Sequence, residues 1–352
     1  MINFAEVIEK ISIPVLVVDG TGTVVLANKR SLNDFPSVQV GEDAQTLWLK
    51  GTGLKKLLRK TVQSNAERTA SMFAIGNNQR EYTVTANILD PTPNSSDTLF
   101  VLTFEDLTPV RTAKSMRSDF VANVSHEIRS PLTAISGFVE SLQDAEDMDA
   151  ETRRFFLGLM EKEVARMTNL VTDLLSLSKV EAKESREVTK RANIIQILQQ
   201  AYESVSGLAN ERSKKVELRI AAELPDVLGK RDDLLRVFIN LLENAINYSR
   251  KIGVVSLTAE VVDGDNPLSR KAICISVTDE GEGIPEAEIP RLTERFYRVD
   301  KSRSRNVGGT GLGLAIVKHI LVRHRGKLVI ESTLGVGSTF SVYLPVDLPK
   351  LR

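Results

Sequence analysis

The chain has 352 residues, of which 42% are hydrophobic and 26% charged, a composition typical of a globular protein with two or three domains of about 150 residues each. Its 46 basic and 46 acidic side chains give no net charge, which argues against nucleic acid as a partner. A single cysteine, Cys274, excludes a disulfide framework, and no apolar run reaches the roughly 20 residues of a membrane span. No secretory signal opens the chain, so we expect a cytoplasmic protein.

The first segment, up to about Glu105, consists of short β-branched runs separated by turn residues. The runs read IPVLVVD, GTVVLAN, REYTVTANIL and TLFVLTFED. Alternating apolar residues in short runs between glycines and prolines are typical of strands. The segment therefore predicts a small α+β domain with an antiparallel sheet.

The middle segment, from Pro109 to about Ala182, is helical in pattern. Two series of residues recur with spacings of 3 and 4: Val121, Val124, Ile128, Pro131, Ile135, Phe138 and Leu142, then Phe156, Met160, Glu163, Met167, Leu170, Leu174 and Leu177. Both series are heptad seams, and a short acidic stretch separates them. They predict an antiparallel helical hairpin, which either pairs with a second copy to form a dimeric four-helix bundle or packs onto a larger monomer.

A third segment mixes strands and helices after a polar run at 179–192. We expect four parts, with boundaries at 1–108, 109–182, 183–191 and 192–352. The part 183–191 is a linker and a candidate hinge. Glycine-rich loops at 279–283 and 307–313 lie in the last part.

His126 lies on the outer face of the first predicted helix. When Val124 occupies heptad position d, His126 falls at f, which is the position farthest from the seam. An exposed imidazole is largely unprotonated at pH 7 and can act as a nucleophile, and the adjacent Glu127 can take up or orient the ring proton. On position alone, an ordinary solvated histidine remains the alternative.

The surrounding string decides between these alternatives. Residues 120–133, FVANVSHEIRSPLT, closely resemble the H-box of two-component sensor histidine kinases. The resemblance implies that His126 accepts a phosphoryl group from ATP. Ser130 stands where the family has Thr or Asn, a side chain that positions a water for dephosphorylating the partner regulator. The resemblance to the H-box thus implies a catalytic set of His126, Glu127 and Ser130.

Further boxes follow in the family's order. The helix NLLENAINYS carries Asn240, Glu243, Asn244 and Asn247 on one polar face, and their oxygens suit Mg²⁺ and its waters. It is similar to the N-box. DEGEGIP (279–285) resembles the G1 box, and RFYRVDKSRSR (295–305) resembles the F-box with the ATP lid. GGTGLGLAIVKHI (308–320) resembles the G2 box, and GSTFSVYLP resembles a late adenine-side contact. The glycine cluster runs into a helix whose free N–H groups suit phosphates.

The resemblance implies a nucleotide site of many residues. Glu243 and Asn244 would hold the metal, and Asp279 would read the adenine amino group. The implied nucleotide-binding residues are Asn240, Asn244, Asn247, Tyr248, Asp279, Gly281, Gly283, Arg298, Lys301, Gly309, Gly311, Leu312, Gly313, Leu314 and Thr339. We expect His319 and His324 to be structural and Cys274 to be a buried strand residue.

Together these boxes imply a multidomain protein. The expected architecture is the hairpin followed by an α/β sandwich of the Bergerat (GHKL) ATPase type. Before them, residues 1–105 resemble a PAS domain in the strand VLVVD, the run VVLAN and the terminal string FEDLT, so we expect an α+β PAS-like sensor domain there. The expected cofactors are ATP and Mg²⁺, and the expected partners are a response regulator receiver domain and a second copy of the chain. FVANVSHEIR followed by GFVESL most resembles the phosphate-regulon sensor kinase subgroup, whose members commonly carry membrane segments, so attachment through a membrane partner is open.

Two other functions are weighed beside the kinase. A GHKL-type conformational ATPase would share the sandwich but would need no exposed His126. A phosphatase-biased scaffold with weak kinase activity is suggested by Ser130 and by Asn247, which stands where the family commonly has lysine.

Overall fold

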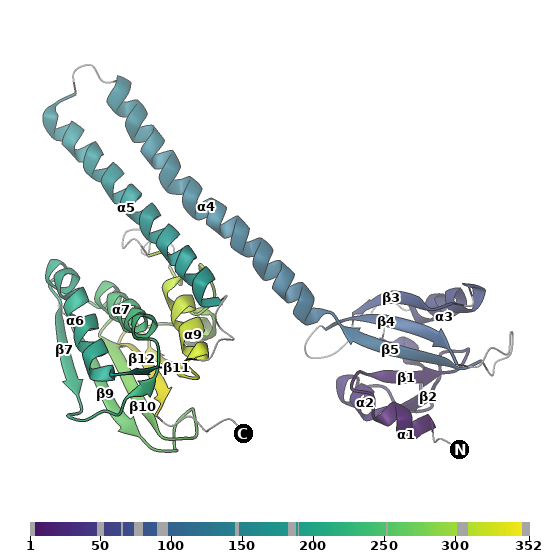
Figure 1. Ribbon diagram of the computed structural model, residues 1–352. Helices are drawn as coiled ribbons and strands as arrows, with labels where there is room; N and C mark the ends of the chain where they lie inside the picture. Colours follow the sequence, from purple (N-terminus) through teal and green to yellow (C-terminus); the bar gives the residue numbers. More distant parts are fainter. Residues whose placement is uncertain are drawn as a thin grey trace. The chain divides into compact units, whose positions relative to one another are not determined.

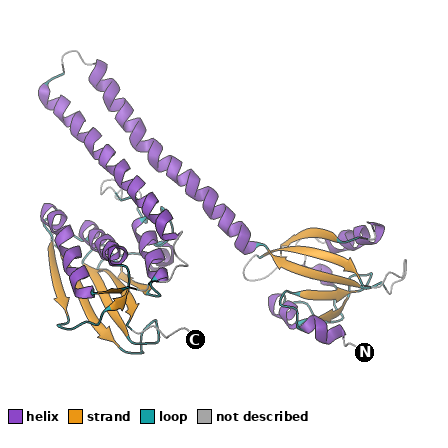
Figure 2. Ribbon diagram, viewed as in Figure 1, coloured by secondary structure: helices purple, strands orange, loops and turns teal. Residues whose placement is uncertain are grey.

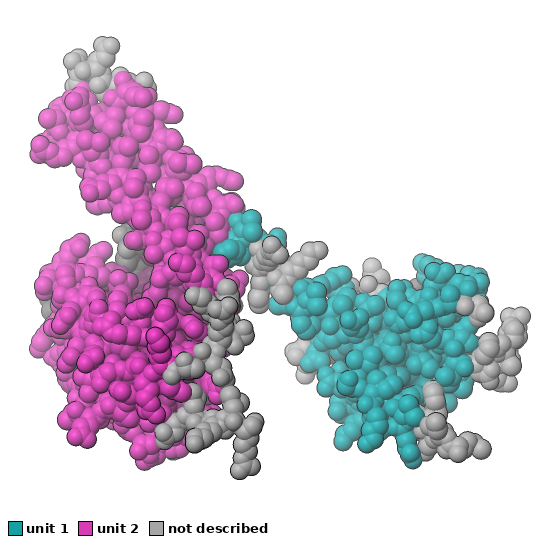
Figure 3. Space-filling view, viewed as in Figure 1, with its two compact units in different colours: residues 1–122 teal, residues 123–352 magenta. Residues whose placement is uncertain are grey.

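A computed structural model describes residues 4–47, 53–64, 66–73, 80–89, 98–144, 148–181, 188, 190–250, 253–300 and 309–346. The chain divides into two compact units, Met1–Ala122 and Asn123–Arg352, which Figure 3 shows in different colours. The boundary falls within one long helix, so that helix contributes residues to both units.

The first unit contains a five-stranded sheet with short helices (Figure 1). Its sheet order is β2-β1-β5-β4-β3, and every neighbouring pair is antiparallel. The elements are α1 (Phe4–Glu9), β1 (Val15–Val18), β2 (Val24–Ala27), α2 (Lys29–Asp34), the 3-10 helix η1 (Ala44–Leu47), α3 (Gly53–Ser64), β3 (Arg68–Phe73), β4 (Glu81–Ile88) and β5 (Phe100–Asp106). The predicted antiparallel α+β domain is confirmed.

Strand β1 is buried on both faces, which explains why its sequence VLVV is apolar without alternation. Leu16 and Val18 join the main core, whereas Val15 and Val17 pack with Ile8 of α1 on the other side. Strands β4 and β5 alternate instead, and their inward aromatic side chains meet Phe35, whose ring centroid lies 5.1 Å from that of Tyr82 and 4.9 Å from that of Phe104. These rings fill the middle of the core.

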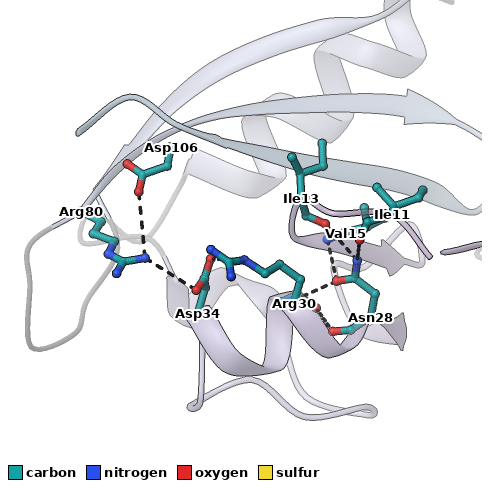
Figure 4. Close-up of polar contacts among 9 residues, drawn as sticks. Ile11, Ile13, Val15, Asn28, Arg30, Asp34, Arg80 and Asp106 are labelled. Atoms are coloured by element: carbon teal, nitrogen blue, oxygen red, sulfur yellow. Dashed lines mark hydrogen bonds and ion pairs between the residues drawn. The ribbon is translucent and has the colours of Figure 1, made fainter. Parts of the chain in front are cut away.

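Two polar clusters fix the loops of this unit (Figure 4). The buried Asn28 side chain accepts from the backbone N–H of Val15 at 3.0 Å and donates to the carbonyl oxygens of Ile11 and Ile13. Arg80 lies between two carboxylates, 3.6 Å from Asp34 and 3.9 Å from Asp106. Asp106 also accepts from the backbone N–H of Thr108 at 2.8 Å, so this cluster holds the start of the long helix that follows β5.

The long helix α4 (Thr108–Asp144) and α5 (Ala150–Glu181) form the predicted antiparallel hairpin. From Val124 to Leu142 the first seam is half-buried or buried, and the rings of Phe138 and Phe156 lie 5.7 Å apart across it. Leu170 and Leu177 of the second seam are 3% and 1% exposed. Val121 differs from its predicted place in the seam, because it is 58% exposed.

The rest of the second unit is a two-layer α/β sandwich (Figure 2). Its sheet order is β11-β12-β10-β9-β7, antiparallel except for the β7–β9 pair. The elements are β6 (Arg191–Ala192), α6 (Ile194–Glu211), β7 (Lys215–Ile220), β8 (Val227–Leu228), α7 (Arg231–Tyr248), β9 (Val254–Val262), β10 (Ala272–Asp279), the 3-10 helix η2 (Glu286–Arg291), α9 (Gly313–Arg323), β11 (Lys327–Thr333) and β12 (Gly337–Pro345).

Helices α6, α7 and α9 lie together on one side of this sheet in Figure 2, and the apolar residues of β10 and β12 face their layer. The other face of these strands is more polar: Thr278 pairs with Thr339 at 3.0 Å between hydroxyl oxygens, and Ser276 pairs with Ser341 at 2.8 Å. Cys274 lies on this second face and is half-buried, so the expectation of a buried strand residue is corrected.

The predicted linker 183–191 lies largely outside the described residues. Its end differs from the prediction, because Arg191 belongs to β6 and pairs with Leu228 of β8. The backbone N–H of Gly229 also donates to the carbonyl oxygen of Lys190 at 2.8 Å. The sandwich therefore begins at least two residues earlier than position 192.

Candidate active site

His126 lies exposed on the outer face of α4, as its heptad position predicts. The seam residues Val124 and Ile128 on either side of it are half-buried against the hairpin. Pro131 lies inside the same helix and cannot donate to the carbonyl oxygen of Glu127, which leaves that backbone acceptor without its helical partner. The imidazole is therefore accessible to a reactant.

Glu127, beside the histidine, is held by two arginines. Its Oε2 lies 3.0 Å from Arg166 Nη2 of α5 and 3.3 Å from Arg298 Nη2 of the sandwich. The side chain of Arg298 is only 7% exposed, and burial lowers its pKa while the Glu127 carboxylate raises it. An arginine remains charged even so, and the contact ties the sandwich to the residue next to His126.

A cavity of about 810 Å³ lies between α5, α7 and the loop that opens α9. Most of the predicted nucleotide-binding and metal-binding residues line it. These are Asn240, Glu243, Asn244, Asn247, Tyr248, Asp279, Gly283, Arg298, Gly309, Gly311, Gly313 and Leu314. A cavity of this size, apolar in part and with convergent polar groups, suits a nucleotide.

Helix α7 presents the predicted polar face to this cavity because its opposite face is fully apolar and packs into the core. Asn247 Oδ1 is buried and has no hydrogen-bond partner among the residues that the structure describes, so the site leaves an acceptor for a ligand or water. Glu243 opens to the cavity, yet the surrounding protein raises its pKa, and the carboxylate of Asp173 raises it further.

Asp279 ends strand β10 at the wall of the cavity and is 6% exposed. Burial raises the pKa of its carboxyl to about 6, although backbone N–H groups, including that of Gly281 at 2.8 Å from Oδ1, favour the ionised form. At pH 7 the carboxylate can therefore accept a hydrogen bond from an amine inside the cavity.

Two glycines allow the loops to turn and approach closely. Gly283 and Gly311 both have φ of +71°, a conformation that other residues adopt only with strain. A Cβ on Gly311 would lie 2.9 Å from the Cα of Phe296, and one on Gly283 would collide with the Thr333 carbonyl. Larger side chains at these positions would displace the loops that line the cavity.

Three of the predicted nucleotide-binding residues do not line the cavity. The side chain of Leu312 is fully buried in the core, and the backbone N–H of Gly281 donates a hydrogen bond to Asp279 Oδ1. Thr339 points to the other face of the sheet, where it pairs with Thr278. The neighbouring Ser338 lines the cavity, so it replaces Thr339 in the site; Lys301 lies outside the described residues.

Other lining residues escaped the sequence analysis. Thr310 lies within the glycine cluster and Arg236 lies one turn before Asn240 on α7, so both could have been found by extending the motifs. Asn169, Thr172 and Asp173 come from α5, where polar residues on an amphipathic helix give no signal of their own. Only the fold brings them to the cavity.

The two remaining histidines serve structure. Burial lowers the pKa of His324, whose neutral ring lies 2.7 Å from the Ile320 carbonyl oxygen and accepts from the Lys230 N–H at 3.0 Å. His324 thus joins the end of α9 to the start of α7. His319 Nε2 lies 3.4 Å from Glu181 at the end of α5.

Neither a metal centre nor a membrane span is evident within the described ranges. No three acidic, histidine or cysteine side chains there are grouped as metal ligands. Within the same ranges, no helix combines the length and apolarity needed to cross a bilayer.

Family models match two parts of the chain. The His Kinase A (phospho-acceptor) domain matches residues 116–183, and the histidine kinase-, DNA gyrase B- and HSP90-like ATPase matches residues 229–348. Both matches fall on the elements described above, one on the hairpin and one on the sandwich.

Curated relatives share these two domains. The phosphate regulon sensor protein PhoR of Pseudomonas aeruginosa is 41% identical over 239 residues, which are 68% of this chain and 52% of PhoR. The sensor histidine kinase WalK of Bacillus subtilis is 34% identical over 244 residues, 68% of this chain and 38% of WalK. The chain thus spans about half the length of PhoR and less of WalK.

Solved structures show the same fold. Histidine kinase ThkA in complex with response regulator protein TrrA aligns with a TM-score of 0.52 at 19% identity, covering 97% of this chain and 98% of that one. Acinetobacter baumannii histidine kinase AdeS aligns with a TM-score of 0.50 at 24% identity over 63% of this chain and 98% of that one. The chain belongs to the sensor histidine kinases, with a phospho-acceptor hairpin followed by an ATPase domain of the gyrase B and HSP90 type.

Proposed function

We propose that the chain is an ATP-dependent protein-histidine kinase that phosphorylates itself on His126 and passes the phosphoryl group to an aspartate of a response regulator. The observation that carries this proposal is an exposed histidine on the same hairpin whose second helix lines the cavity holding Asn244 and Asp279. The complex of ThkA with a response regulator supports the choice of partner.

In the autophosphorylation step, no side chain other than His126 needs to form a covalent bond. A ring nitrogen of His126 forms a bond to the γ-phosphorus, the bond from that phosphorus to the β,γ-bridging oxygen breaks, and ADP leaves. The ring proton passes to Glu127 or to solvent. Because Glu127 is paired with Arg166 and Arg298, it must leave these arginines before it can act as a base.

The residues present fit ATP and Mg²⁺. Asp279 supplies an acceptor for the adenine amine, and the start of α9 with Gly309, Gly311 and Gly313 supplies N–H groups for phosphates. Asn244 with Glu243 would hold Mg²⁺, which neutralises phosphate charge when bound. The amide oxygen of Asn247, buried without a partner among the described residues, is a further acceptor for a metal-bound water.

Incubation with γ-labelled ATP and Mg²⁺ tests the kinase. The wild-type chain should acquire a label that is labile in acid and stable in alkali, and His126→Gln should lose it while still binding ATP. Label retained in His126→Gln would place the acceptor elsewhere. ATP hydrolysis without any label would favour the conformational ATPase instead.

The phosphatase half of the proposal rests on Ser130. Its side chain is exposed one helical turn after His126, where it can reach a water beside a docked receiver domain. A scaffold with weak kinase activity would show this dephosphorylation of the regulator with little labelling of His126.

We also propose a domain organisation with a PAS-like sensor at 1–108, the hairpin at 109–182, a linker from 183 that ends before Lys190, and the sandwich from Lys190 onward. The five-stranded antiparallel sheet that begins with VLVV and ends in the strand feeding α4 supports a PAS-like domain. The identity with the phosphate regulon sensor protein PhoR supports a place for the chain in a phosphate-responsive system.

The hairpin supports a homodimer built as a four-helix bundle. A second apolar row on α5, at heptad spacing, is exposed in the single chain: Leu157, Val164, Val171 and Leu175, at 52%, 53%, 47% and 57%. Apolar rows of this kind are covered by partner helices in bundles.

Val164→Glu should therefore weaken the dimer by at least about 100-fold, because each dimer would bury two unpaired carboxylates. Lys162→Glu, on an exposed part of α5 outside this row, should leave the dimer intact. Analytical ultracentrifugation over a concentration series measures both. Equal dissociation constants for the two variants would contradict the bundle.

A further inference from the structure

Helix α5 of the hairpin forms one wall of the nucleotide cavity, and Asp173 is the charged residue of that wall. Its Oδ1 accepts from Arg236 Nη2 at 2.8 Å, and its Oδ2 accepts from the Thr310 hydroxyl at 2.7 Å. The Asp173 side chain is 20% exposed and that of Arg236 30%, so both are largely withdrawn from water. Arg236 also donates to the hydroxyl of Ser176, one turn further along α5.

Both donors lie where the cavity is suited to phosphates. Thr310 stands between Gly309 and Gly311, directly before the N-terminus of α9, and Arg236 lies one turn before Asn240 on α7. A guanidinium, a hydroxyl and a helix N-terminus are the groups that bind phosphate oxygens in proteins. The Asp173 carboxylate therefore occupies donors that a nucleotide's phosphates would use.

The charge in this part of the cavity is already negative. Asp173 and Glu243 both line the cavity, and acidic side chains outnumber the arginines among the residues that line it. A triphosphate entering beside Asp173 would add further negative charge in a partly desolvated space. Nucleotide binding should therefore expel the Asp173 side chain, or be weakened by it.

We propose that Asp173 competes with nucleotide phosphates for Arg236 and Thr310, so that docking of the hairpin on the sandwich and nucleotide binding oppose each other. The inference rests on the proposed function, because it assumes that this cavity binds ATP. Linkage makes this effect reciprocal: the factor by which docking of the hairpin lowers the affinity for ATP equals the factor by which bound ATP weakens docking. A change that draws α5 away from the cavity should therefore raise the affinity for ATP.

The contacts around Asp173 form one docked surface. Glu181 at the end of α5 lies 2.6 Å from Arg295, and Glu127 lies 3.3 Å from Arg298. All three carboxylates belong to the hairpin, whereas Arg236, Arg295 and Arg298 belong to the sandwich. Release of Asp173 by a nucleotide would weaken this surface, including the contact of Arg298 with Glu127 beside His126.

The variant Asp173→Asn tests the competition, because it removes the charge and keeps the shape. Titration calorimetry with Mg-ATP on the full chain should give a dissociation constant lower than that of the wild type by about fivefold or more. Glu140→Gln, an exposed acidic position on α4 away from the cavity, is the matched control and should leave the constant unchanged.

Hydrogen exchange provides a second readout. In the wild type, Mg-ATP should increase exchange in peptides covering residues 166–181, because α5 loses its contacts with the sandwich. In Asp173→Asn the same peptides should exchange faster before ATP is added. A circular dichroism spectrum identical to that of the wild type ensures that the helices are intact.

The outcomes separate this inference from the kinase proposal. Wild type and Asp173→Asn binding ATP equally, or the variant binding more weakly, would overturn the competition and leave the kinase intact. Failure of both chains to bind ATP would overturn both proposals. Binding by the variant but not by the wild type would support the competition in its strongest form.

Discussion

Asp279→Asn is expected to weaken nucleotide binding by at least about tenfold and, at the same time, to stabilise the folded chain in the absence of ligand. The binding loss follows because an amide at this position is a weaker acceptor than a carboxylate and presents an N–H₂ group to the adenine amine. The gain in stability follows because the side chain is 6% exposed, so burial of its charged form destabilises the folded chain.

The pH dependence has a definite sign. The folded pKa of Asp279, about 6, lies above its ordinary value of 3.8, so the folded chain holds the proton more tightly than the unfolded chain. The contribution of Asp279 to the free energy of unfolding is fully present below pH 3.8 and decreases as the pH rises to about 6. The corresponding penalty at pH 8 is of the order of 3 kcal/mol as an upper bound.

Asp279→Asn should therefore stabilise the chain by about 1–3 kcal/mol at pH 8, and by about 1 kcal/mol less at pH 5. Urea unfolding at both pH values measures this difference. Titration of the wild type with ATP should show affinity falling below about pH 6, where the carboxyl becomes protonated. A pH-independent gain, or a variant that binds ATP as tightly as the wild type, would contradict the role of Asp279.

Asn244→Ala is expected to lower the labelling of the chain by γ-labelled ATP by at least about 100-fold. Asn244 lies at the middle of the polar face of α7, half-buried and open to the cavity, so the change removes an oxygen ligand from the centre of the site. Gln199→Ala removes an exposed amide from α6 outside the cavity and serves as control.

Both variants should keep the wild-type far-ultraviolet circular dichroism and the same dimer mass, because neither residue belongs to the apolar face of its helix. Labelling of Asn244→Ala within threefold of the wild type would be incompatible with a site built on α7. Loss of labelling in Gln199→Ala would show instead that the assay reports stability rather than nucleotide binding.

Periodicity predicted the parts of this fold that depend on local burial. The seams around Ile128 and Leu170 required helices because their spacing matches the helical turn, and the alternation of β4 required one buried face. The polar face of α7 was visible for the same reason, since Asn240 and Asn244 lie one turn apart.

Features that depend on register or on distant pairing were not visible. Successive strand residues point to opposite faces, so choosing Thr339 rather than Ser338 moved the predicted contact out of the cavity. The ion pair between Glu127 and Arg298 joins residues 171 positions apart, and only the fold brings them together. The same holds for Asp173 and Thr310.

The site of phosphorylation is the most direct test of the account. After incubation of the wild-type chain with Mg-ATP, peptides prepared under alkaline conditions and analysed by mass spectrometry should carry the phosphoryl group on His126. Phosphate found on His319, His324 or a hydroxyl side chain, with His126 unmodified, would contradict the account.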